Sequence, residues 1–388
     1  MNFGTRTLAA ALLAVLPGLS LAGQGVTDTQ VSFAQVAALE GPAAALGQGM
    51  RTGMMAAFAE ANAKGGVHGR QIILDSLDDG YEPDRSVSHV KSVIAGDNHL
   101  GLIGAVGTPT ASATQPVATE AGLPFVGPFT GAGFLRDASH GNIYNVRASY
   151  FAETEAWIAY LVDELGMKSI ALLYQDDGFG RVGLAGVTEA LTKRGMTLSA
   201  EGTYTRNTVA VKKALLEIRK AEPDAVVMVG AYKPVAEFIR LSRKLKFDPT
   251  FVNISFVGSD ALASELGDDG EGVIISQVVP FPWDETRPVV AQYHAALKAV
   301  DAAAEPGFVT LEGYLTGRLV IRALEDAGQA LTRDSFLAAL AALRDVDFGG
   351  VVMRFGPGDN QGMDDVFLTR ITRGGGFEPV ATAAGNGA

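Results

Sequence analysis

The sequence of 388 residues contains no cysteine and only five histidines. The absence of cysteine excludes disulfides, cysteine-ligated zinc, iron–sulfur clusters, thiol nucleophiles and a lipid-modified cysteine anchor. No two histidines are four residues apart, which argues against a histidine-based metal site; they are His68, His89, His99, His140 and His294. We therefore expect neither a metal nor any other cofactor.

Basic residues are scarce, with 31 lysines and arginines against 43 acidic residues and a formal net charge of −12. Contacts to phosphates need clustered basic side chains, so we expect no nucleic-acid partner. Hydrophobic residues make up 47% and charged residues 19%, which is a globular composition. The length is sufficient for two domains with ordinary cores.

Motifs of catalysis are missing as well. The chain has no G-x-S-x-G nucleophile elbow and no P-loop, and we expect no G-x-G-x-x-G turn between a strand and a helix. Nucleophilic hydrolysis and nucleotide binding therefore have little support. Carboxylate pairs that could hold Ca²⁺ or act as acid and base occur at Asp78-Asp79, Asp176-Asp177 and Asp268-Asp269. Solvated turns beside glycine are the favoured interpretation of these pairs. We predict a binding protein that is not an enzyme.

The N-terminal residues 1–22 have the pattern of a secretory signal peptide. Arg6 supplies positive charge, the stretch from Leu8 to Leu21 is mostly apolar, and the sequence Ser20-Leu21-Ala22 offers a cleavage site. The apolar stretch is too short and too interrupted for a membrane anchor, and no later segment is long enough to span a bilayer. We predict cleavage after Ala22 and an exported protein, with the periplasm as its location.

After residue 26 the chain alternates short apolar runs with amphipathic stretches, in two series of similar size. In the first series we expect strands at 30–38, 71–75, 100–106 and 124–129, with helices at 46–64, 84–95 and 110–122. In the second we expect strands at 169–175, 198–204, 224–231, 251–258 and 272–279, with helices at 151–166, 181–195, 209–221 and 234–246. This alternation predicts an α/β protein with two related lobes, each built on a parallel sheet covered by helices.

The C-terminal third breaks this rhythm. Three helical stretches, 288–304, 308–326 and 332–343, follow one another without strands between them, and we expect them to pack on the first lobe. Strand character returns at 351–355 and 366–372, and residues 381–388 read as a flexible tail.

Four loops lie just beyond the carboxyl ends of predicted strands, where ligands collect in open α/β sheets. They are 107–112, 127–132, 230–234 and 258–261. In the first loop, Thr108 and Thr110 could bind an anion together with the free N–H groups of the following helix, or they could simply cap that helix. Tyr232 could offer a ring and a phenol to a ligand or only pack, and Asp260 could face a ligand cation or cap a helix.

Short motifs in this order resemble the periplasmic branched-chain amino-acid-binding proteins, which supply solutes to ABC importers. The resemblance covers about residues 26–375. Its motifs are Leu39-Glu40-Gly41-Pro42-Ala43, Asn62-Ala63-Lys64-Gly65-Gly66, Asp78-Asp79 with Pro83, Thr114-Gln115-Pro116, Tyr174-Gln175-Asp176-Asp177 with Phe179-Gly180, and Gly230-Ala231-Tyr232.

The resemblance implies the type I periplasmic binding protein fold, in which two Rossmann-like lobes with parallel sheets are joined by three crossovers. The crossovers would fall near Arg147, Phe281 and Phe355. Residues 26–146 and 282–355 would form lobe 1, and residues 147–281 and 356–380 would form lobe 2. The ligand would lie between the lobes and be enclosed as they close.

The resemblance also implies roles for single residues. Thr108, Thr110 and Ala111 would receive a carboxylate, and Asp260 would pair with an ammonium group. The remaining residues expected to contact the ligand are Thr130, Gly131, Ser149, Tyr150, Phe179 and Tyr232. Two departures from the family pattern, Leu46 in place of an aromatic residue and Lys233 after Tyr232, indicate a pocket suited to something other than leucine, and Arg147 could add positive charge near the cleft.

The function implied is that of a monomeric periplasmic subunit that captures an amino acid or related small polar solute and delivers it to an inner-membrane ABC permease. A ligand sensor of the same fold that feeds a signalling partner stays open as an alternative. Binding of amides, urea-like compounds or aromatic carboxylates stays open too. An α/β enzyme is a third hypothesis, which the missing catalytic motifs disfavour.

Overall fold

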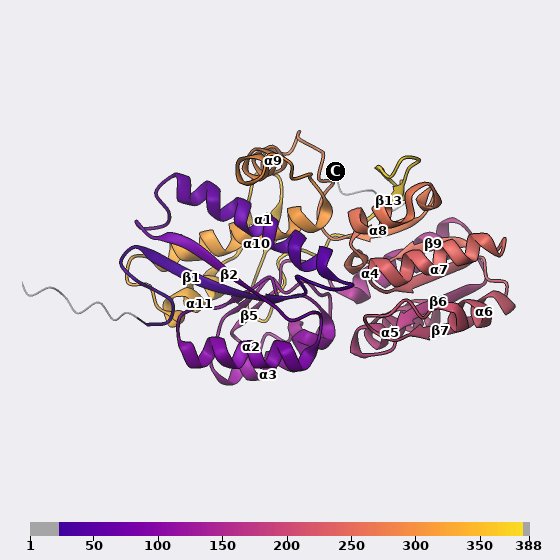
Figure 1. Ribbon diagram of the computed structural model, residues 1–388, viewed down its shortest axis with the longest axis horizontal. Helices are drawn as coiled ribbons and strands as arrows, with labels where there is room; N and C mark the ends of the chain where they lie inside the picture. Colours follow the sequence, from indigo (N-terminus) through magenta and orange to yellow (C-terminus); the bar gives the residue numbers. More distant parts are fainter. Residues whose placement is uncertain (1–22, 383–388) are drawn as a thin grey trace, which may run out of the picture.

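Figure 1 shows the computed structural model, which describes residues 23–382 as two lobes that lie side by side. The predicted signal peptide, 1–22, lies outside the described residues, and so does most of the predicted tail, 383–388. Within residues 23–382 no helix combines the length and the apolar character that crossing a membrane requires.

The first lobe is built on a parallel sheet with the strand order β2-β1-β3-β4-β5. Its strands are β1 (Gln30–Ala37), β2 (Gln71–Asp78), β3 (Leu102–Ile103), β4 (Phe125–Val126) and β5 (Ile143–Tyr144). Its helices are α1 (Ala44–Ala63), α2 (Pro83–Gly96), α3 (Thr108–Glu120) and the short 3₁₀ helix η1 (Gly133–Arg136). Helices α2 and α3 lie on one side of the sheet and α1 on the other (Figure 1). Because β3 and β4 are neighbouring parallel strands, the loops that follow them meet at the same sheet edge.

The second lobe is built on a seven-stranded sheet with the order β14-β13-β10-β9-β8-β6-β7. Its strands are β6 (Ile170–Gln175), β7 (Ala200–Tyr204), β8 (Ala225–Val229), β9 (Thr250–Asn253), β10 (Ile274–Gln277), β13 (Phe367–Ile371) and β14 (Phe377–Pro379). Its helices are α4 (Tyr150–Ile158) with a π-helical turn η2 (Ala159–Glu164), α5 (Gly178–Thr192), α6 (Lys212–Lys220), α7 (Tyr232–Lys244) and α8 (Ser259–Leu266). Every residue of β6 and β8 is buried, as expected of parallel strands with helices on both faces.

The three C-terminal helices pack on the first lobe, as predicted. They are α9 (Pro288–Val300), α10 (Phe308–Ala327) and α11 (Arg333–Ala342), and a hairpin of β11 (Asp345–Asp347) and β12 (Val352–Arg354) follows them. Helix α10 packs so closely against α1 that a Cβ atom added at Gly53 would lie 2.0 Å from the Thr310 carbonyl oxygen. Glycine at this position therefore permits the close approach of the two helices.

The structure differs from the sequence-based prediction in several places. The second sheet is not purely parallel, because β13 pairs antiparallel with both β10 and β14. The stretch 251–258 is not one strand: β9 ends at Asn253, and a 3₁₀ turn η3 (Ser255–Val257) follows. A second 3₁₀ turn, η4 (Gly267–Gly270), ends α8, and β5, β11 and β14 had no predicted counterpart.

The chain passes between the two sheets three times. The connecting segments are 145–169, 278–287 and 355–366, and they contain the predicted crossover residues Arg147, Phe281 and Phe355. The two-lobed α/β fold with three crossovers is thereby confirmed. The division of the chain into lobes at the ranges stated above stays a prediction.

Candidate functional site

The two threonine loops of the first lobe meet as the sheet topology requires. The hydroxyl oxygens of Thr108 and Thr130 lie 2.7 Å apart, and both side chains are buried. Helix α3 starts at Thr108, Gly107 precedes it with φ of 104°, and no side chain caps this helix. An uncapped helix N-terminus beside two hydroxyl groups is a suitable place for an anionic oxygen.

Thr110 and Ala111 make hydrogen bonds within the first turn of α3 in this structure. The Thr110 hydroxyl donates to the carbonyl oxygens of Val106 and Gly107, and the Ala111 N–H donates to Gly107 O at 3.0 Å. The Ala111 side chain is buried in a small apolar core that also contains Leu102. These donors are occupied by the first turn of α3, so the contact of both residues with a ligand stays a prediction.

The predicted residues of the first crossover lie against the second threonine loop. The Tyr150 N–H donates to Gly131 O at 2.8 Å, and a Cβ atom added at Gly131 would lie 2.5 Å from Tyr150 Cδ1. The Ser149 hydroxyl accepts the Ala152 N–H at 3.2 Å and so caps α4. Glycine at 131 is therefore what allows the Tyr150 ring to lie on this loop.

Arg136 ties this loop to the crossovers. Its guanidinium group donates to the carbonyl oxygens of Thr130 at 3.1 Å, Ala132 at 3.0 Å and Arg147 at 3.0 Å, and to Gln361 Oε1 at 2.7 Å. Burial lowers the pKa of Arg136 to about 10, so it keeps its charge at neutral pH. One side chain thereby holds the 130–132 loop, the first crossover and the third crossover together.

A buried ion pair stands beside these residues. Arg147 donates from Nε and Nη2 to the two carboxylate oxygens of Glu312, at 2.8 and 2.7 Å, and the two side chains are 1% and 3% exposed. Burial lowers the pKa of Arg147, but the charge of Glu312 outweighs it and raises the pKa overall. The guanidinium carbon lies 4.1 Å from the centre of the Phe129 ring. The sequence analysis named Arg147 as a possible charge near the cleft. Glu312 was not predicted, because nothing in the sequence distinguishes it from the other residues of its helix.

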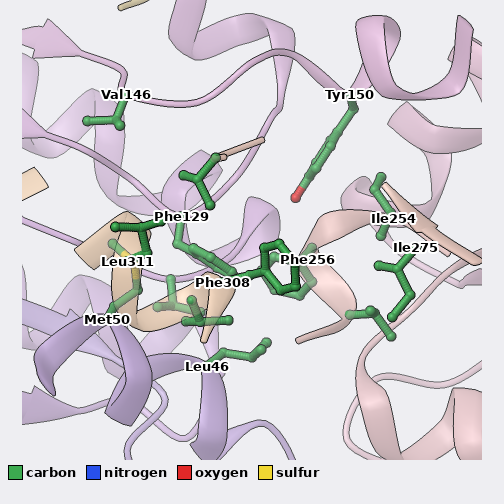
Figure 2. Packing of buried hydrophobic residues seen from close by; sticks show 14 of the residues in the cluster. Leu46, Met50, Phe129, Val146, Tyr150, Ile254, Phe256, Ile275, Phe308 and Leu311 are labelled. Atoms are coloured by element: carbon green, nitrogen blue, oxygen red, sulfur yellow. The ribbon is translucent and has the colours of Figure 1, made fainter. Parts of the chain in front are cut away.

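Aromatic side chains join the two lobes at the centre of the molecule. Phe256 of η3 lies 4.6 Å from Phe179, 5.5 Å from Phe129 and 5.9 Å from Tyr81, measured between ring centres. Figure 2 shows the Tyr150 hydroxyl pointing toward Phe129 and Phe256, with Leu46 on the other side of Phe256. The predicted contact residue Phe179 thus belongs to this cluster, and its ring centre is 5.5 Å from that of Tyr150.

Asp260 borders a cavity between the lobes, and Tyr232 lies near Gly258, which is part of the cavity lining. The cavity has a volume of about 170 Å³, and its lining comprises Ala45, Leu46, Gly49, Gly258, Asp260, Ala261, Glu305, Pro306, Gly307, Val309 and Thr310. The Tyr232 hydroxyl accepts the Ala45 N–H at 3.4 Å, so it reaches from α7 to α1 across the lobes.

Asp260 is half-buried in the first turn of α8, and its carboxylate lies against the start of α10. A Cβ atom added at Gly307 would lie 2.3 Å from Asp260 Oδ2, so this approach needs glycine at 307. Burial raises the pKa of Asp260 to about 6, although hydrogen bonds from the backbone of Asp260 and Phe308 act in the opposite direction. The pKa of this carboxyl group is thus set by its burial and by backbone N–H donors, and no cation is among the causes.

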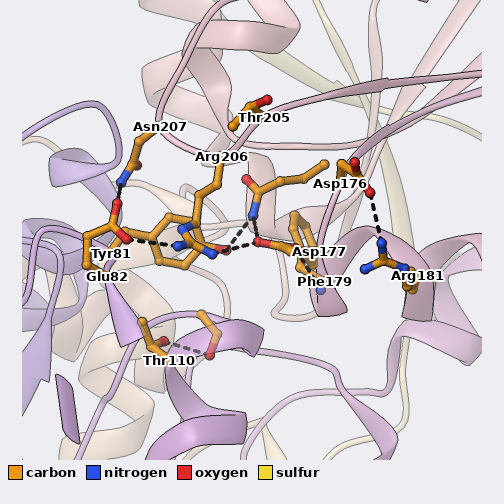
Figure 3. Close-up of polar contacts among 12 residues, drawn as sticks. Tyr81, Glu82, Thr110, Asp176, Asp177, Phe179, Arg181, Thr205, Arg206 and Asn207 are labelled. Atoms are coloured by element: carbon orange, nitrogen blue, oxygen red, sulfur yellow. Dashed lines mark hydrogen bonds and ion pairs between the residues drawn. The ribbon is translucent and has the colours of Figure 1, made fainter. Parts of the chain in front are cut away.

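A polar bridge connects the lobes at a different place (Figure 3). Arg206 donates to Glu82 at 2.8 Å and to Asp177 at 3.1 Å, and Asn207 donates to Glu82 at 2.7 Å and to Gly80 O at 3.0 Å. Burial raises the pKa of Glu82, but the hydrogen bonds from Arg206 and Asn207 outweigh it and lower the pKa. We call the side chains of Glu82, Asp177, Arg206 and Asn207 the polar bridge. The sequence motifs included only Asp177 among these four residues, and nothing in them indicated a contact between the lobes.

Two of the carboxylate pairs organise turns and cap helices rather than forming a metal site. Asp78 accepts the N–H groups of Leu39 and Glu40, and Asp79 accepts the Ser86 hydroxyl. Within the described part of the chain, no group of three or more side chains of the kinds that bind metals comes together.

The expectation that no G-x-G-x-x-G turn occurs is wrong for the sequence spacing, because the run Gly178-Phe179-Gly180-Arg181-Val182-Gly183 follows β6 with this spacing. Its helix N-terminus is capped by the Asp177 carboxylate, which would repel a pyrophosphate. The glycines instead allow α5 to pack on the sheet, since a Cβ atom at Gly180 would lie 1.9 Å from Gln175 O.

Comparison with known proteins agrees with this architecture. The sequence pattern of the family described as periplasmic binding protein matches residues 30–376. The chain belongs to the periplasmic binding protein family. The resemblance to its branched-chain amino-acid-binding members is confirmed, and the protein is a solute-binding protein rather than an enzyme.

Individual relatives show how far the likeness extends. The crystal structure of a possible leucine/isoleucine/valine-binding protein from Rhodopirellula baltica superposes with a TM-score of 0.87 at 37% identity, covering 91% of this chain and 96% of that one. The Leu/Ile/Val-binding protein BraC3 of Rhizobium johnstonii is 27% identical over 86% of this chain and 88% of its own length. Leu/Ile/Val-binding protein homolog 7 of Brucella melitensis is 25% identical, and the match spans 62% of each chain.

Proposed function

We propose that this protein captures an amino acid, or a similarly small solute that carries both a carboxylate and an amine, between its two lobes. In this proposal the protein acts as a monomer in the periplasm, after removal of residues 1–22, and delivers its solute to an inner-membrane ABC permease. The observation that carries the proposal is the half-buried Asp260 carboxyl group, which borders a cavity between the lobes and has only backbone N–H donors acting against its burial.

The amine of the solute would supply the missing cation. A carboxylate taken from water into a half-buried site is stabilised when a positive charge pairs with it. An ammonium group in the cavity would pair with Asp260 directly and would lower the pKa of its carboxyl group. Tyr232 and Leu46 would then surround the apolar part of the solute.

The carboxylate of the solute would bind at the uncapped start of α3, near the hydroxyl groups of Thr108 and Thr130. Each charge-assisted hydrogen bond contributes about 1.5–3 kcal/mol. Micromolar affinity corresponds to about 8 kcal/mol, which a few such bonds together with apolar burial supply. The Phe256 cluster lies between these two regions, so we expect its rings to move apart when a solute binds both.

The names of the relatives agree with this chemistry, since BraC3 is named a Leu/Ile/Val-binding protein and the Rhodopirellula protein a possible leucine/isoleucine/valine-binding protein. Leu46 and Lys233 depart from the family pattern, so we do not expect leucine to be the best solute.

The experiment is a thermal-shift screen of the mature protein against amino acids, amides, urea-like compounds and aromatic carboxylates, followed by calorimetry on each hit. A solute at one hundred times its dissociation constant stabilises the protein by about 2.7 kcal/mol. Asp260→Asn should weaken an amine-bearing solute at least tenfold and leave a solute without an amine unaffected. Stabilisation by amine-free compounds alone would reject the proposal in favour of the amide or aromatic-acid alternatives.

A sensor of the same fold stays a second candidate. Its solute site would be the same, and only the partner would differ. Co-purification from membranes with a permease or with a signalling protein separates the two roles.

A further inference from the structure

We infer that Arg147 and Tyr150 form a carboxylate-binding subsite at the first crossover, which makes the solute a carboxylate rather than an amide or a urea-like compound. The inference rests on the proposed function, because it assumes that a solute enters the space between the lobes. It concerns which solutes are accepted there and which residues decide this.

The first observation is a pair of buried donors without acceptors. Within residues 23–382, neither the Tyr150 hydroxyl nor Arg147 Nη1 makes a hydrogen bond of good geometry, and the two residues are 0% and 1% exposed. The Thr130 side chain and the Gly131 backbone lie near the Tyr150 hydroxyl, and they act against the rise that burial causes in the pKa of the phenol. A buried hydrogen-bonding group without a partner destabilises the fold, so such groups are kept rarely and often for function. A phenol proton and the N–H groups of a guanidinium nitrogen both require an oxygen acceptor.

The second observation is that these donors lie at one place. Arg147 and Tyr150 are three residues apart, the Arg147 guanidinium carbon is 4.1 Å from the Phe129 ring centre, and the Tyr150 ring lies against Gly131. Burial raises the pKa of the Tyr150 phenol, and the nearby charge of Arg147 acts against this rise. Thr130, whose hydroxyl is paired with that of Thr108, lies between Phe129 and Gly131 in the same loop.

The surrounding charges determine what the subsite accepts. Glu312 holds the other two nitrogens of Arg147, which fixes the plane of the guanidinium group and leaves Nη1 to donate. The second buried acid nearby, Glu153, is occupied by the Ser255 N–H and hydroxyl and by the Ser276 hydroxyl. Arg136 donates to backbone carbonyls and to Gln361.

A carboxylate oxygen would accept from both Nη1 and the phenol in charge-assisted hydrogen bonds. An amide or urea carbonyl oxygen could accept the same two hydrogen bonds, but without the charge of a carboxylate, and its N–H groups would bring donors to a place where the protein itself offers donors. The subsite therefore discriminates by hydrogen-bond polarity, and an acid should bind much more tightly than its amide.

The test compares Tyr150→Phe with the wild-type protein by thermal shift and calorimetry. The probes are L-leucine, L-valine, L-phenylalanine and L-glutamate, each beside its α-carboxamide, with benzoate and 4-methylpentanoate as acids without an amine. We expect the wild-type protein to bind at least one acid ten times or more tightly than the matching amide. Tyr150→Phe should bind that acid at least tenfold more weakly and should melt close to the wild-type temperature, because the lost hydroxyl makes no hydrogen bond of good geometry.

Tyr314→Phe is the matched control. Its hydroxyl donates to Glu60 at 2.7 Å and accepts from Arg318 at 3.0 Å, so this variant should melt at a lower temperature and bind the same acid unchanged. The two tyrosine variants should thus show opposite patterns. A merely structural role of Tyr150 would make them alike.

The second variant tests Arg147 without leaving a buried charge alone. Arg147→Met combined with Glu312→Gln removes both charges at similar volume, so neither member of the pair is left as a buried charge without its partner. This variant should fold, and its preference for the acid over the amide should fall at least tenfold.

The outcomes separate the two proposals. Equal affinity of the wild-type protein for an acid and its amide, or unchanged acid binding by Tyr150→Phe, would overturn the subsite and leave the amine site at Asp260 standing. Binding of benzoate or 4-methylpentanoate alone, weakened by Tyr150→Phe, would support the subsite and reject the proposed amino-acid function. Failure of every acid to bind would reject both.

Discussion

Two arginines beside carboxylates connect the parts of this molecule, and their surroundings differ. Arg206 of the polar bridge is 22% exposed and faces Glu82, which is 44% exposed, in addition to Asp177. Arg147 is 1% exposed and faces Glu312, which is 3% exposed, and its Nη1 has no partner in the described part of the chain. In the part of the chain that the structure describes, each arginine has one buried nitrogen without a partner, Nε of Arg206 and Nη1 of Arg147. The two ion pairs differ in exposure, since the Arg206 pair is partly open to water and the Arg147 pair is almost completely buried.

This difference in burial indicates different roles: the Arg206 contact holds the lobes together, and Arg147 is placed to bind a solute. An exposed ion pair contributes little free energy because water competes for both charges. A buried pair is costly to desolvate, and each partner becomes essential to the other. We therefore expect a substitution at Arg147 to change which solutes bind. A substitution at Arg206 should change only slightly how readily the lobes close.

The largest effect is expected when the buried pair is broken on one side. Arg147→Met alone leaves the Glu312 carboxylate buried without a cation, which should lower the free energy of unfolding by about 3–5 kcal/mol. Urea denaturation followed by circular dichroism measures this loss. The double variant with Glu312→Gln should recover most of it, and a single variant as stable as the wild-type protein would contradict the account of the pair.

A smaller effect is expected from pH. Because burial raises the pKa of Asp260 to about 6, its carboxylate is ionised above pH 7 and becomes protonated as the pH falls below 6. An amine-bearing solute prefers the ionised form, so its affinity should be constant above pH 7 and should be about tenfold lower at pH 5. Calorimetry at several pH values measures this profile.

The control for this profile is Asp260→Asn. Its affinity for the amine-bearing solute should be low and independent of pH over this range. A wild-type profile that stays flat from pH 8 to pH 5 would show that Asp260 does not pair with the solute.

The smallest effect is expected at the polar bridge. Arg206→Ala removes contacts to Glu82 and Asp177 that favour the closed arrangement, and it should weaken solute binding about two- to fivefold, corresponding to at most about 1 kcal/mol. Raising the salt concentration should weaken wild-type binding in the same direction and should leave the variant less affected. A loss of a hundredfold or more would place Arg206 in the solute site itself.

The fold was predictable because its signals are local. The glycine-terminated helix α1 and the apolar strands β6 and β8 follow directly from periodicity and from buried-strand composition. Strand β13 was predicted at 366–372, but its antiparallel pairing was not, because a short apolar run does not indicate the direction of its neighbouring strand. Strand β14 was not predicted at all. The turn at Ser255–Val257 was missed because its residues are as apolar as those of the strand before it.

Part of the site was predictable because loops that follow neighbouring parallel strands meet at one edge of the sheet. Thr108 and Thr130 lie in two such loops, and their hydroxyl groups do come together. Phe256 was concealed within the predicted strand 251–258, and Glu312 lies on α10, which is distant from the first crossover in sequence. The polar bridge depends on how two lobes approach each other, and no pattern within either lobe encodes this.

The central claim is that a solute places its carboxylate beside Thr108 and Thr130, where Tyr150 and Arg147 also donate to it, and its amine at Asp260. A crystal structure of the mature protein with the amino acid that gives the largest thermal shift tests it most directly. We predict a carboxylate oxygen within hydrogen-bond distance of both Tyr150 Oη and Arg147 Nη1, and an amine nitrogen within that distance of the Asp260 carboxylate. A solute bound with its carboxylate elsewhere, or with its amine away from Asp260, would contradict the account.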